Sequence, residues 1–109
     1  MIYTYRAKII GVYDGDTVTA LVDLGFGITN KIKVRLKGIN TPELRGVERA
    51  QGIISRDFLR EKILNKDIVI ETFKDKKGKY GRYIGTLWIN DENINELLVE
   101  QGLAEKKDY

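Results

Sequence analysis

Four short segments of this chain concentrate polar oxygens and cationic side chains. The first is the turn that contains Asp14 and Asp16, and the second is Arg35, on the polar side of an alternating segment. The third is the run 40–43, an amide, a hydroxyl, the only proline and a carboxylate, and the fourth is the basic run 79–82. The chemistry that they perform depends on whether the fold brings the carboxylates and the arginines to one place.

Each segment also has an ordinary structural explanation. Asp14 and Gly15 are typical of a tight hairpin turn, although Asp16 stands at the start of the next strand, where its carboxylate could face the end of a barrel. Arg35 shares its strand face with three lysines, which is the pattern of a solvated surface. The run 40–43 could be a turn that leads into a helix, and the run 79–82 could be a basic hairpin tip.

The absence of cysteine and histidine removes several mechanisms. It excludes a thiol nucleophile, a histidine general base, a disulfide framework and a zinc site of thiolates or imidazoles. Any metal must therefore be held by oxygen ligands, which favours calcium, magnesium or manganese. A net charge of +3 and a pI near 9.1 are compatible with a polyanionic partner, and many proteins without such a partner are equally basic.

Length and composition indicate one folded domain over residues 1–109, with 42% apolar and 32% charged residues. No apolar run approaches the roughly 18 residues that a membrane-spanning helix needs. The first residues lack the basic and apolar regions of a signal peptide. We expect a monomer without membrane contact, and a cytoplasmic location slightly in preference to a secreted one, unless this is a mature form.

Alternation of apolar and polar residues predicts five strands. They lie near residues 3–10, 17–24, 28–37, 68–73 and 83–89, and the segment 74–81 is predicted to be a long basic turn. In the third strand Ile28, Ile32, Val34 and Leu36 form the apolar face, and the opposite face is basic.

Helical spacing appears in two places. From about residue 47 to 64 the apolar positions Ala50, Ile54, Leu59 and Ile63 recur with Phe58 on one predicted face. Near the end of the chain, Asn93 followed three residues later by Glu96 indicates a helix N-cap, and Gly102 is a typical C-terminal stop. The sequence therefore predicts a mixed α+β, mainly β fold: a five-stranded barrel of the oligonucleotide-binding (OB) type, with one helix after strand three and a short C-terminal helix.

In their order and spacing, the polar clusters resemble the staphylococcal nuclease (thermonuclease) family. The matching stretches are DGDTV at 14–18, VRL at 34–36 with TPE at 41–43, KYGR at 79–82 and NELLVEQGLA at 95–104. The resemblance extends from about residue 9 to residue 104. Each block alone is a weak signal, and the common register of all four carries the resemblance.

This resemblance implies a calcium-dependent endonuclease that hydrolyses phosphodiester bonds of DNA and RNA. Asp16 would be a direct ligand of Ca²⁺, and Thr41 would contribute its backbone carbonyl. Asn40 lies where the family usually has a second ligating aspartate, so the site would keep an oxygen ligand but lose a negative charge.

The same resemblance implies roles for the remaining polar residues. Arg35 and Arg82 would stabilise charge on the phosphate oxygens in the transition state. Glu43 would act on the attacking water as a general base or as an orienting group. Lys79 would contact a phosphate and Tyr80 would stack on a base.

Two other interpretations stay open. The chain could be a catalytically impaired member that binds nucleic acid or protein, for which Asn40 is the main support. It could also be a plain oligonucleotide-binding barrel without metal, although such a barrel would expose aromatic residues along its strands, where this chain has basic ones.

Overall fold

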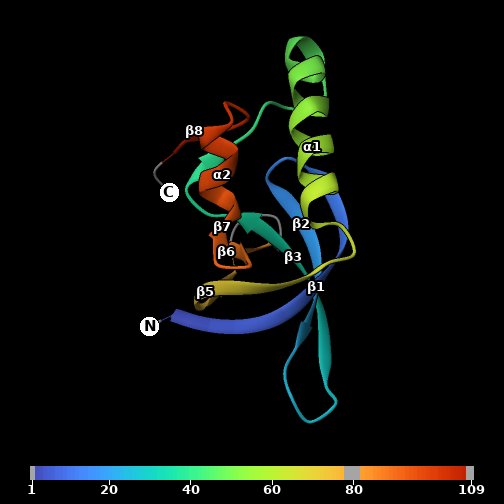
Figure 1. The fold of residues 1–109 in the computed structure, drawn as a ribbon, viewed down its shortest axis with the longest axis vertical. Helices are drawn as coiled ribbons and strands as arrows, with labels where there is room; N and C mark the ends of the chain where they lie inside the picture. The colour runs from blue at the N-terminus through green and yellow to red at the C-terminus, as the bar shows by residue number, and fades with distance from the viewer. Residues whose placement is uncertain (1, 78–81, 108–109) are drawn as a thin grey trace.

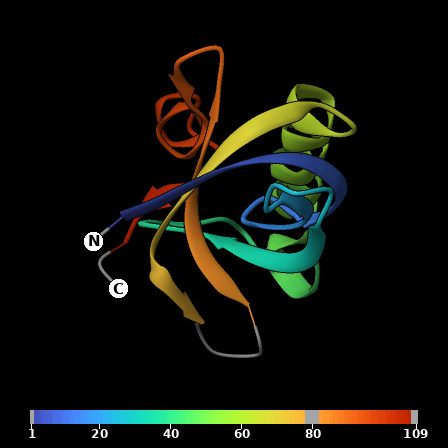
Figure 2. The same ribbon diagram turned by 90° about the horizontal axis from the view of Figure 1, so that it is seen from below.

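The alternating segments of the sequence form a strongly curved sheet that closes on itself. The computed structural model describes residues 2–77 and 82–107. The barrel strands are β1 (Ile2–Asp14), β2 (Thr17–Asp23), β3 (Thr29–Leu36), β5 (Asp67–Lys77) and β6 (Tyr83–Ile89). They are hydrogen-bonded in the order β3-β2-β1-β5-β6, and a parallel pairing of β3 with β6 closes the barrel. Figure 2 shows the strands curving around a common interior. The predicted five-stranded OB-type barrel is confirmed.

The inward residues of the strands follow the predicted alternation. Ala7 and Ile9 on β1, and Val34 and Leu36 on β3, are buried in one core with the residues of the other strands. β1 bends strongly because its pairing with β2 shifts register at two places, after Ile9 and after Val12. This bend brings the end of β1 and the start of β2 to the helical end of the molecule.

Both helices lie at the same end of the barrel, and the loop between β2 and β3 lies at the other (Figure 1). A 3-10 turn, η1 (Gly46–Glu48), leads into α1 (Arg49–Ile63), whose Arg60 donates two hydrogen bonds to the Val12 carbonyl of β1. None of the helices in the described part of the chain is long and apolar enough to cross a membrane.

The short C-terminal helix is α2 (Ile94–Glu100). The Asn93 side chain caps it by accepting a hydrogen bond from the Glu96 N–H at 3.1 Å, as predicted. Gly102, at a φ of 72°, ends it, and the Leu103 N–H then bonds back to the Leu98 carbonyl.

Three two-residue strands were not expected. β4 (Ile39–Asn40) pairs antiparallel with β8 (Glu105–Lys106), so that Asn40 lies opposite Glu105. β7 (Glu92–Asn93) extends the sheet beside β6. The β4–β8 pair fixes the chain immediately before Thr41 to the segment that follows α2.

Three details of the predicted pattern are wrong. The predicted turn 74–81 begins too early, because β5 continues to Lys77; the rest of that turn lies outside the described residues except for Arg82. Ile28, predicted on the apolar face of the third strand, is 56% exposed, because it stands at the tip of the β2–β3 hairpin, before β3 begins.

The third wrong detail is the face of α1 that packs on the barrel. Ala50 and Ile54 are exposed, whereas the buried residues are Gly52, Ser55, Leu59 and Ile63. Small residues are needed here because the helix lies close to the segment that contains Glu43. A Cβ at position 52 would overlap with the Glu43 carbonyl oxygen. Hydrophobicity alone therefore placed the first turns of this helix about one position out of register.

Candidate functional site

Asp16 is the central residue of the polar cluster. It follows the β1–β2 turn and is only 6% exposed. The turn lies tightly against the rest of the site, because a Cβ on Gly15 would come within 2.9 Å of both Thr41 and Ser55. Glycine at this position allows the turn to approach Thr41 closely.

Both oxygens of the Asp16 carboxylate are engaged. Oδ2 accepts a hydrogen bond from the Thr41 backbone N–H at 3.0 Å and lies 3.3 Å from Nη2 of Arg35. Oδ1 accepts from the Thr17 hydroxyl at 3.2 Å. The ion pair with Arg35 is largely buried, with 12% of the arginine side chain and 8% of the aspartate side chain exposed.

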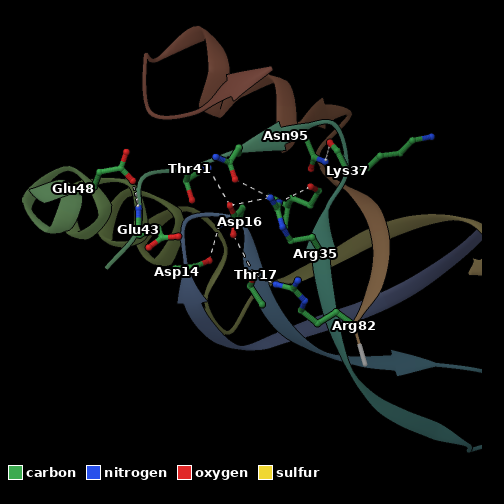
Figure 3. A network of polar contacts seen from close by, with 12 residues as sticks. Asp14, Asp16, Thr17, Arg35, Lys37, Thr41, Glu43, Glu48, Arg82 and Asn95 are labelled. Atoms are coloured by element: carbon green, nitrogen blue, oxygen red, sulfur yellow. Dashed lines mark hydrogen bonds and ion pairs between the residues drawn. The ribbon is translucent and has the colours of Figure 1, made fainter. Parts of the chain in front are cut away.

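Arg82 reaches the same carboxylate through Thr17. Its Nη1 donates to the Thr17 hydroxyl at 3.4 Å, and that hydroxyl donates in turn to Asp16. The register explains this convergence, because Thr17 lies opposite Arg35 in the β2–β3 pair and Arg35 lies beside Ile84 in the β3–β6 pair. Figure 3 shows the two arginines approaching Asp16 from β3 and from the start of β6.

Asn40 and Thr41 form the other wall of the cluster. Nη2 of Arg35 donates to Oδ1 of Asn40 at 3.2 Å, so one guanidinium nitrogen contacts both the amide oxygen and the Asp16 carboxylate. Thr41 is 5% exposed, and within residues 2–77 and 82–107 its buried hydroxyl oxygen has no hydrogen-bond partner. Oxygen atoms of Asp16 and Asn40 therefore lie beside one guanidinium, and the Thr41 backbone N–H contacts the same Asp16 carboxylate.

Asp14 adds a second carboxyl to this cluster. Its Oδ1 accepts the Asp16 backbone N–H at 3.1 Å. Burial, with the neighbouring Asp16 carboxylate adding to it, raises the pKa of the Asp14 carboxyl to about 6. Burial acts in the same direction on Asp16, but the hydrogen bonds from Asp14 and Thr41 and the charge of Arg35 outweigh it and lower the pKa of the Asp16 carboxyl. The pair therefore contains one carboxyl that stays ionised and one that takes up a proton near neutral pH.

The Glu43 side chain, unlike those of Asp16 and Arg35, is not part of the buried network. It is 66% exposed, and its carboxylate lies 3.5 Å from the Arg45 guanidinium. The Glu43 backbone N–H donates to the Glu48 carboxylate at 3.1 Å, a contact that Figure 3 also shows. None of the contacts found among the described residues joins the Glu43 carboxylate to Asp16, Arg35 or Arg82. The structure thus positions the backbone of Glu43 and leaves its side chain at the rim of the site.

The structure brings together Asp16, Arg35, Asn40, Thr41 and Arg82. Lys79 and Tyr80 lie outside the described residues. The functional roles predicted for all of these residues stay predictions.

Sequence reasoning assigned no role to Asp14, Thr17 or Asn95. The first two belong to the DGDTV block, and the in-register position of Thr17 opposite Arg35 was the signal that could have found it. Asn95 of α2 is 3% exposed: its amide donates to the Lys37 and Gly85 carbonyls, and its Oδ1 accepts the Leu87 N–H. It holds the end of β3, just beyond Arg35, against β6.

The cluster has the composition of a site for a hard cation and an anion. Within the described part of the chain there is no group of three or more His, Cys, Asp or Glu residues that could hold a metal. Any cation here would depend on amide, hydroxyl or carbonyl oxygens in addition to the aspartates. The two guanidinium groups suit anionic oxygens such as those of a phosphate.

Comparison with known proteins agrees with this description. Residues 33–109 match the family model described as "Staphylococcal nuclease homologue". The chain is 33% identical to the thermonuclease of Staphylococcus hyicus over 105 residues, which cover 94% of this chain and 59% of that protein. It is 32% identical to the protein ParB of Escherichia coli over 91% of this chain and 55% of that protein. With the thermonuclease of Staphylococcus intermedius it shares 32% identity, over 90% of this chain and 57% of the relative.

A small barrel with a buried aspartate between two arginines, together with these relatives, defines a nuclease-like domain. The chain belongs to the staphylococcal nuclease family. It spans somewhat less than 60% of the length of the three relatives named above, at 59%, 55% and 57%.

Proposed function

We propose that this protein is a calcium-dependent phosphodiesterase that cleaves DNA and RNA. The observation that carries the proposal is the convergence of two arginines on one buried carboxylate, Arg35 directly and Arg82 through Thr17. Names of relatives that include "Thermonuclease" and "Micrococcal nuclease" support the same reaction.

Asp16, Asn40 and Thr41 would hold the calcium ion. Carboxylate, amide and carbonyl or hydroxyl oxygens are the ligands that Ca²⁺ prefers, and the buried hydroxyl oxygen of Thr41, which has no partner in the described part of the chain, is an additional acceptor. When bound, the ion would supply positive charge to an oxygen of the phosphate. The residues present fit this ion, with fewer carboxylates than a high-affinity site has.

The two arginines bind the phosphate and stabilise the transition state. Their planar forks donate paired hydrogen bonds to oxygens of the phosphate, on which negative charge accumulates as the new bond forms. Arg35 is already oriented by Asp16, Asn40 and the Leu36 carbonyl, so little reorganisation is needed when the substrate arrives.

Glu43 acts on the attacking water. Its exposed carboxylate is accessible to solvent, and the Glu48 contact holds its backbone in place. A carboxylate in this position orients the water or accepts its proton as the water oxygen bonds to phosphorus, while the bond from phosphorus to one ester oxygen breaks and that oxygen leaves with a proton from solvent.

The test is a cleavage assay on single-stranded DNA, duplex DNA and RNA, with calcium and with a chelator. Arg35→Ala and Glu43→Ala are expected to lower the calcium-dependent rate about 100- to 1000-fold, the usual cost of removing a charge-stabilising group. Arg6→Ala, which changes an exposed arginine on β1, is the matched control and should cleave like the parent protein.

The second candidate is a binding module without catalysis. It is favoured by the neutral side chain of Asn40 and by the absence of a three-residue acidic metal cluster in residues 2–77 and 82–107. Tight binding of nucleic acid without cleavage in calcium, magnesium and manganese would select this candidate and overturn the proposed reaction.

A further inference from the structure

A cleft of about 320 Å³ adjoins the polar cluster on the outer surface of the barrel. It is lined by Tyr13, Asp14, Thr17, Thr19, Lys33 and Arg82. Thr17 and Arg82 also belong to the network around Asp16. The cleft is therefore continuous with the place where a phosphate would meet the two arginines.

Strand register determines which side chains line this cleft. Thr19 lies opposite Lys33, and Thr17 lies opposite Arg35, in the β2–β3 pair. Lys33 and Arg35 thus project from the same face of β3, about 6.8 Å apart along the strand. Two cations at this spacing on one strand can contact successive phosphates of an extended nucleic acid.

Tyr13 forms the aromatic wall of the cleft. It is 72% exposed and stands at the second register shift of β1, between the buried Val12 and the half-buried Asp14. A single exposed aromatic residue is ordinary on a protein surface. An exposed ring beside a cleft that has a cation on its far side, on β3, is a platform on which a base can stack.

Asp14 indicates which part of a nucleotide enters the cleft. Its carboxyl lies on the wall between Tyr13 and the Asp16 turn, where it disfavours a phosphate and can accept a hydrogen bond from a base N–H. The cationic residues Arg82 and Lys33 stand on other walls. This charge distribution suits a base inside the cleft and phosphates at its edges.

We propose that this cleft is a nucleotide subsite, in which Tyr13 stacks on the base next to the phosphate held by Arg35 and Arg82, and Lys33 contacts the following phosphate. The inference rests on the proposed function and specifies its substrate class. A base reaches the Tyr13 ring only when it is not paired in a duplex, so single-stranded nucleic acid or a locally opened duplex is the preferred substrate.

The test compares two oligomers of equal length and charge, one of thymidine and one of abasic sugar phosphates. Binding is measured by fluorescence anisotropy in the presence of a chelator. Tyr13→Ala should weaken binding of the thymidine oligomer about tenfold and leave binding of the abasic oligomer unchanged. Tyr13→Phe, which keeps the ring, should bind like the parent protein.

Two further variants complete the experiment. Lys33→Gln should weaken binding of both oligomers and reduce the dependence of log K on log salt by about 0.7, the value for one phosphate contact on a single strand. Phe26→Ala, at a fully exposed aromatic residue in the β2–β3 loop, and Lys66→Gln, at an exposed lysine after α1, are the matched controls and should leave binding unchanged.

The subsite and the proposed function fail in different ways. Three results would overturn the subsite, whatever the cleavage assay gives. Tyr13→Ala could bind the thymidine oligomer as tightly as the parent protein does, or it could lose affinity for both oligomers by the same factor. The third such result is a parent protein that binds neither oligomer. If the base-dependent loss occurs but the parent cleaves nothing in calcium, the subsite stands and the phosphodiesterase proposal fails.

Discussion

The two sides of the candidate site are held in different ways. Asp16, Arg35 and Arg82 are connected across β2, β3 and the start of β6 by an ion pair and hydrogen bonds that are largely buried. Glu43 lies between β4 and η1, and within the described residues its exposed carboxylate forms an ion pair with Arg45 alone. The arginine side is therefore preorganised by the barrel, whereas the glutamate side depends on how its loop packs against α1.

This contrast matches the tasks assigned to the two sides. Charge stabilisation requires groups that do not reorganise during the reaction, which favours buried residues on strands. A group that handles water must be reached by solvent, which favours an exposed position. Four predictions, in order of decreasing effect, test whether the arginine side and the glutamate side of the site can be altered independently of each other.

The largest effect is expected at Asn95, on the arginine side. Asn95→Ala removes three hydrogen bonds in a largely buried region, those with the Leu87 N–H and with the Lys37 and Gly85 carbonyls, although the Gly85 carbonyl also accepts the Lys37 N–H. The free energy of unfolding, measured by urea denaturation, should fall by about 3 kcal/mol. Asn30→Ala, at an exposed position of β3, is the control and should change it by less than about 0.5 kcal/mol. A loss below about 1 kcal/mol at Asn95 would show that this side is not held through α2.

Gly52→Ala tests the glutamate side. The added Cβ overlaps with the Glu43 carbonyl, so either the loop or the helix must move. Overpacking costs about 1–3 kcal/mol, offset in part by the roughly 1 kcal/mol that alanine gains in a helix, so we expect a net loss of up to about 2 kcal/mol in the free energy of unfolding.

The cleavage rate distinguishes the sides more sharply than stability does. Gly52→Ala should lower the rate about tenfold under conditions where the protein is folded, because Glu43 is displaced. Gly11→Ala is the matched control, since its Cβ would meet Thr19 at an ordinary 3.6 Å. An unchanged cleavage rate in Gly52→Ala would show that the reaction does not depend on the position of Glu43.

Asn40→Asp tests the metal side of the site. Adding a carboxylate beside Asp16 should tighten calcium binding roughly tenfold and should not lower activity, since charge on the ligands helps to set affinity. Isothermal titration of the protein with calcium measures this directly. Weaker binding in the variant would place Asn40 outside the ligand shell and leave it as a partner of Arg35.

The smallest expected effect is that of replacing Asp14 on the free energy of unfolding, and this effect depends on pH. The pKa of Asp14 is raised from 3.8 to about 6 in the folded protein, so the folded state binds the proton more tightly than the unfolded state does. The stability from this group is complete below about pH 4 and is lost as the pH rises through about 6.

Asp14→Asn should therefore stabilise the metal-free protein near pH 7 by about 1 kcal/mol after allowance for solvent exposure, and have little effect near pH 4. Urea denaturation across this pH range measures the difference between variant and parent. Asp16, whose pKa is lowered, contributes in the opposite sense and loses its stabilisation as the pH falls. A difference that shrinks as the pH rises would contradict the raised pKa of Asp14.

The barrel was predictable from the sequence because it depends on local patterns. The alternation in β3 placed Arg35 on the outer face, the Asp14–Gly15 turn placed Asp16 at the start of β2, and Asn93 marked the start of α2. Each of these features is determined by a few neighbouring residues.

Features that depend on contacts between distant segments were not predictable in this way. The packed face of α1 contains Gly52 and Ser55, whose fit to the Glu43 backbone and to the Leu103 carbonyl is invisible to a hydrophobicity pattern. The bridging role of Thr17 required the β2–β3 register together with the position of Arg82. The cleft at Tyr13 likewise depends on the bulge at the end of β1.

The most direct test of the account is the calcium dependence of cleavage of a labelled single-stranded oligonucleotide under single-turnover conditions. The parent protein should cleave it at a rate that saturates with calcium and vanishes with a chelator. Arg35→Lys, which keeps the charge but loses the guanidinium fork, should reduce the saturated rate about 100-fold. Binding of the oligonucleotide by the parent without cleavage at any calcium concentration would contradict the assignment of this site as a phosphodiesterase.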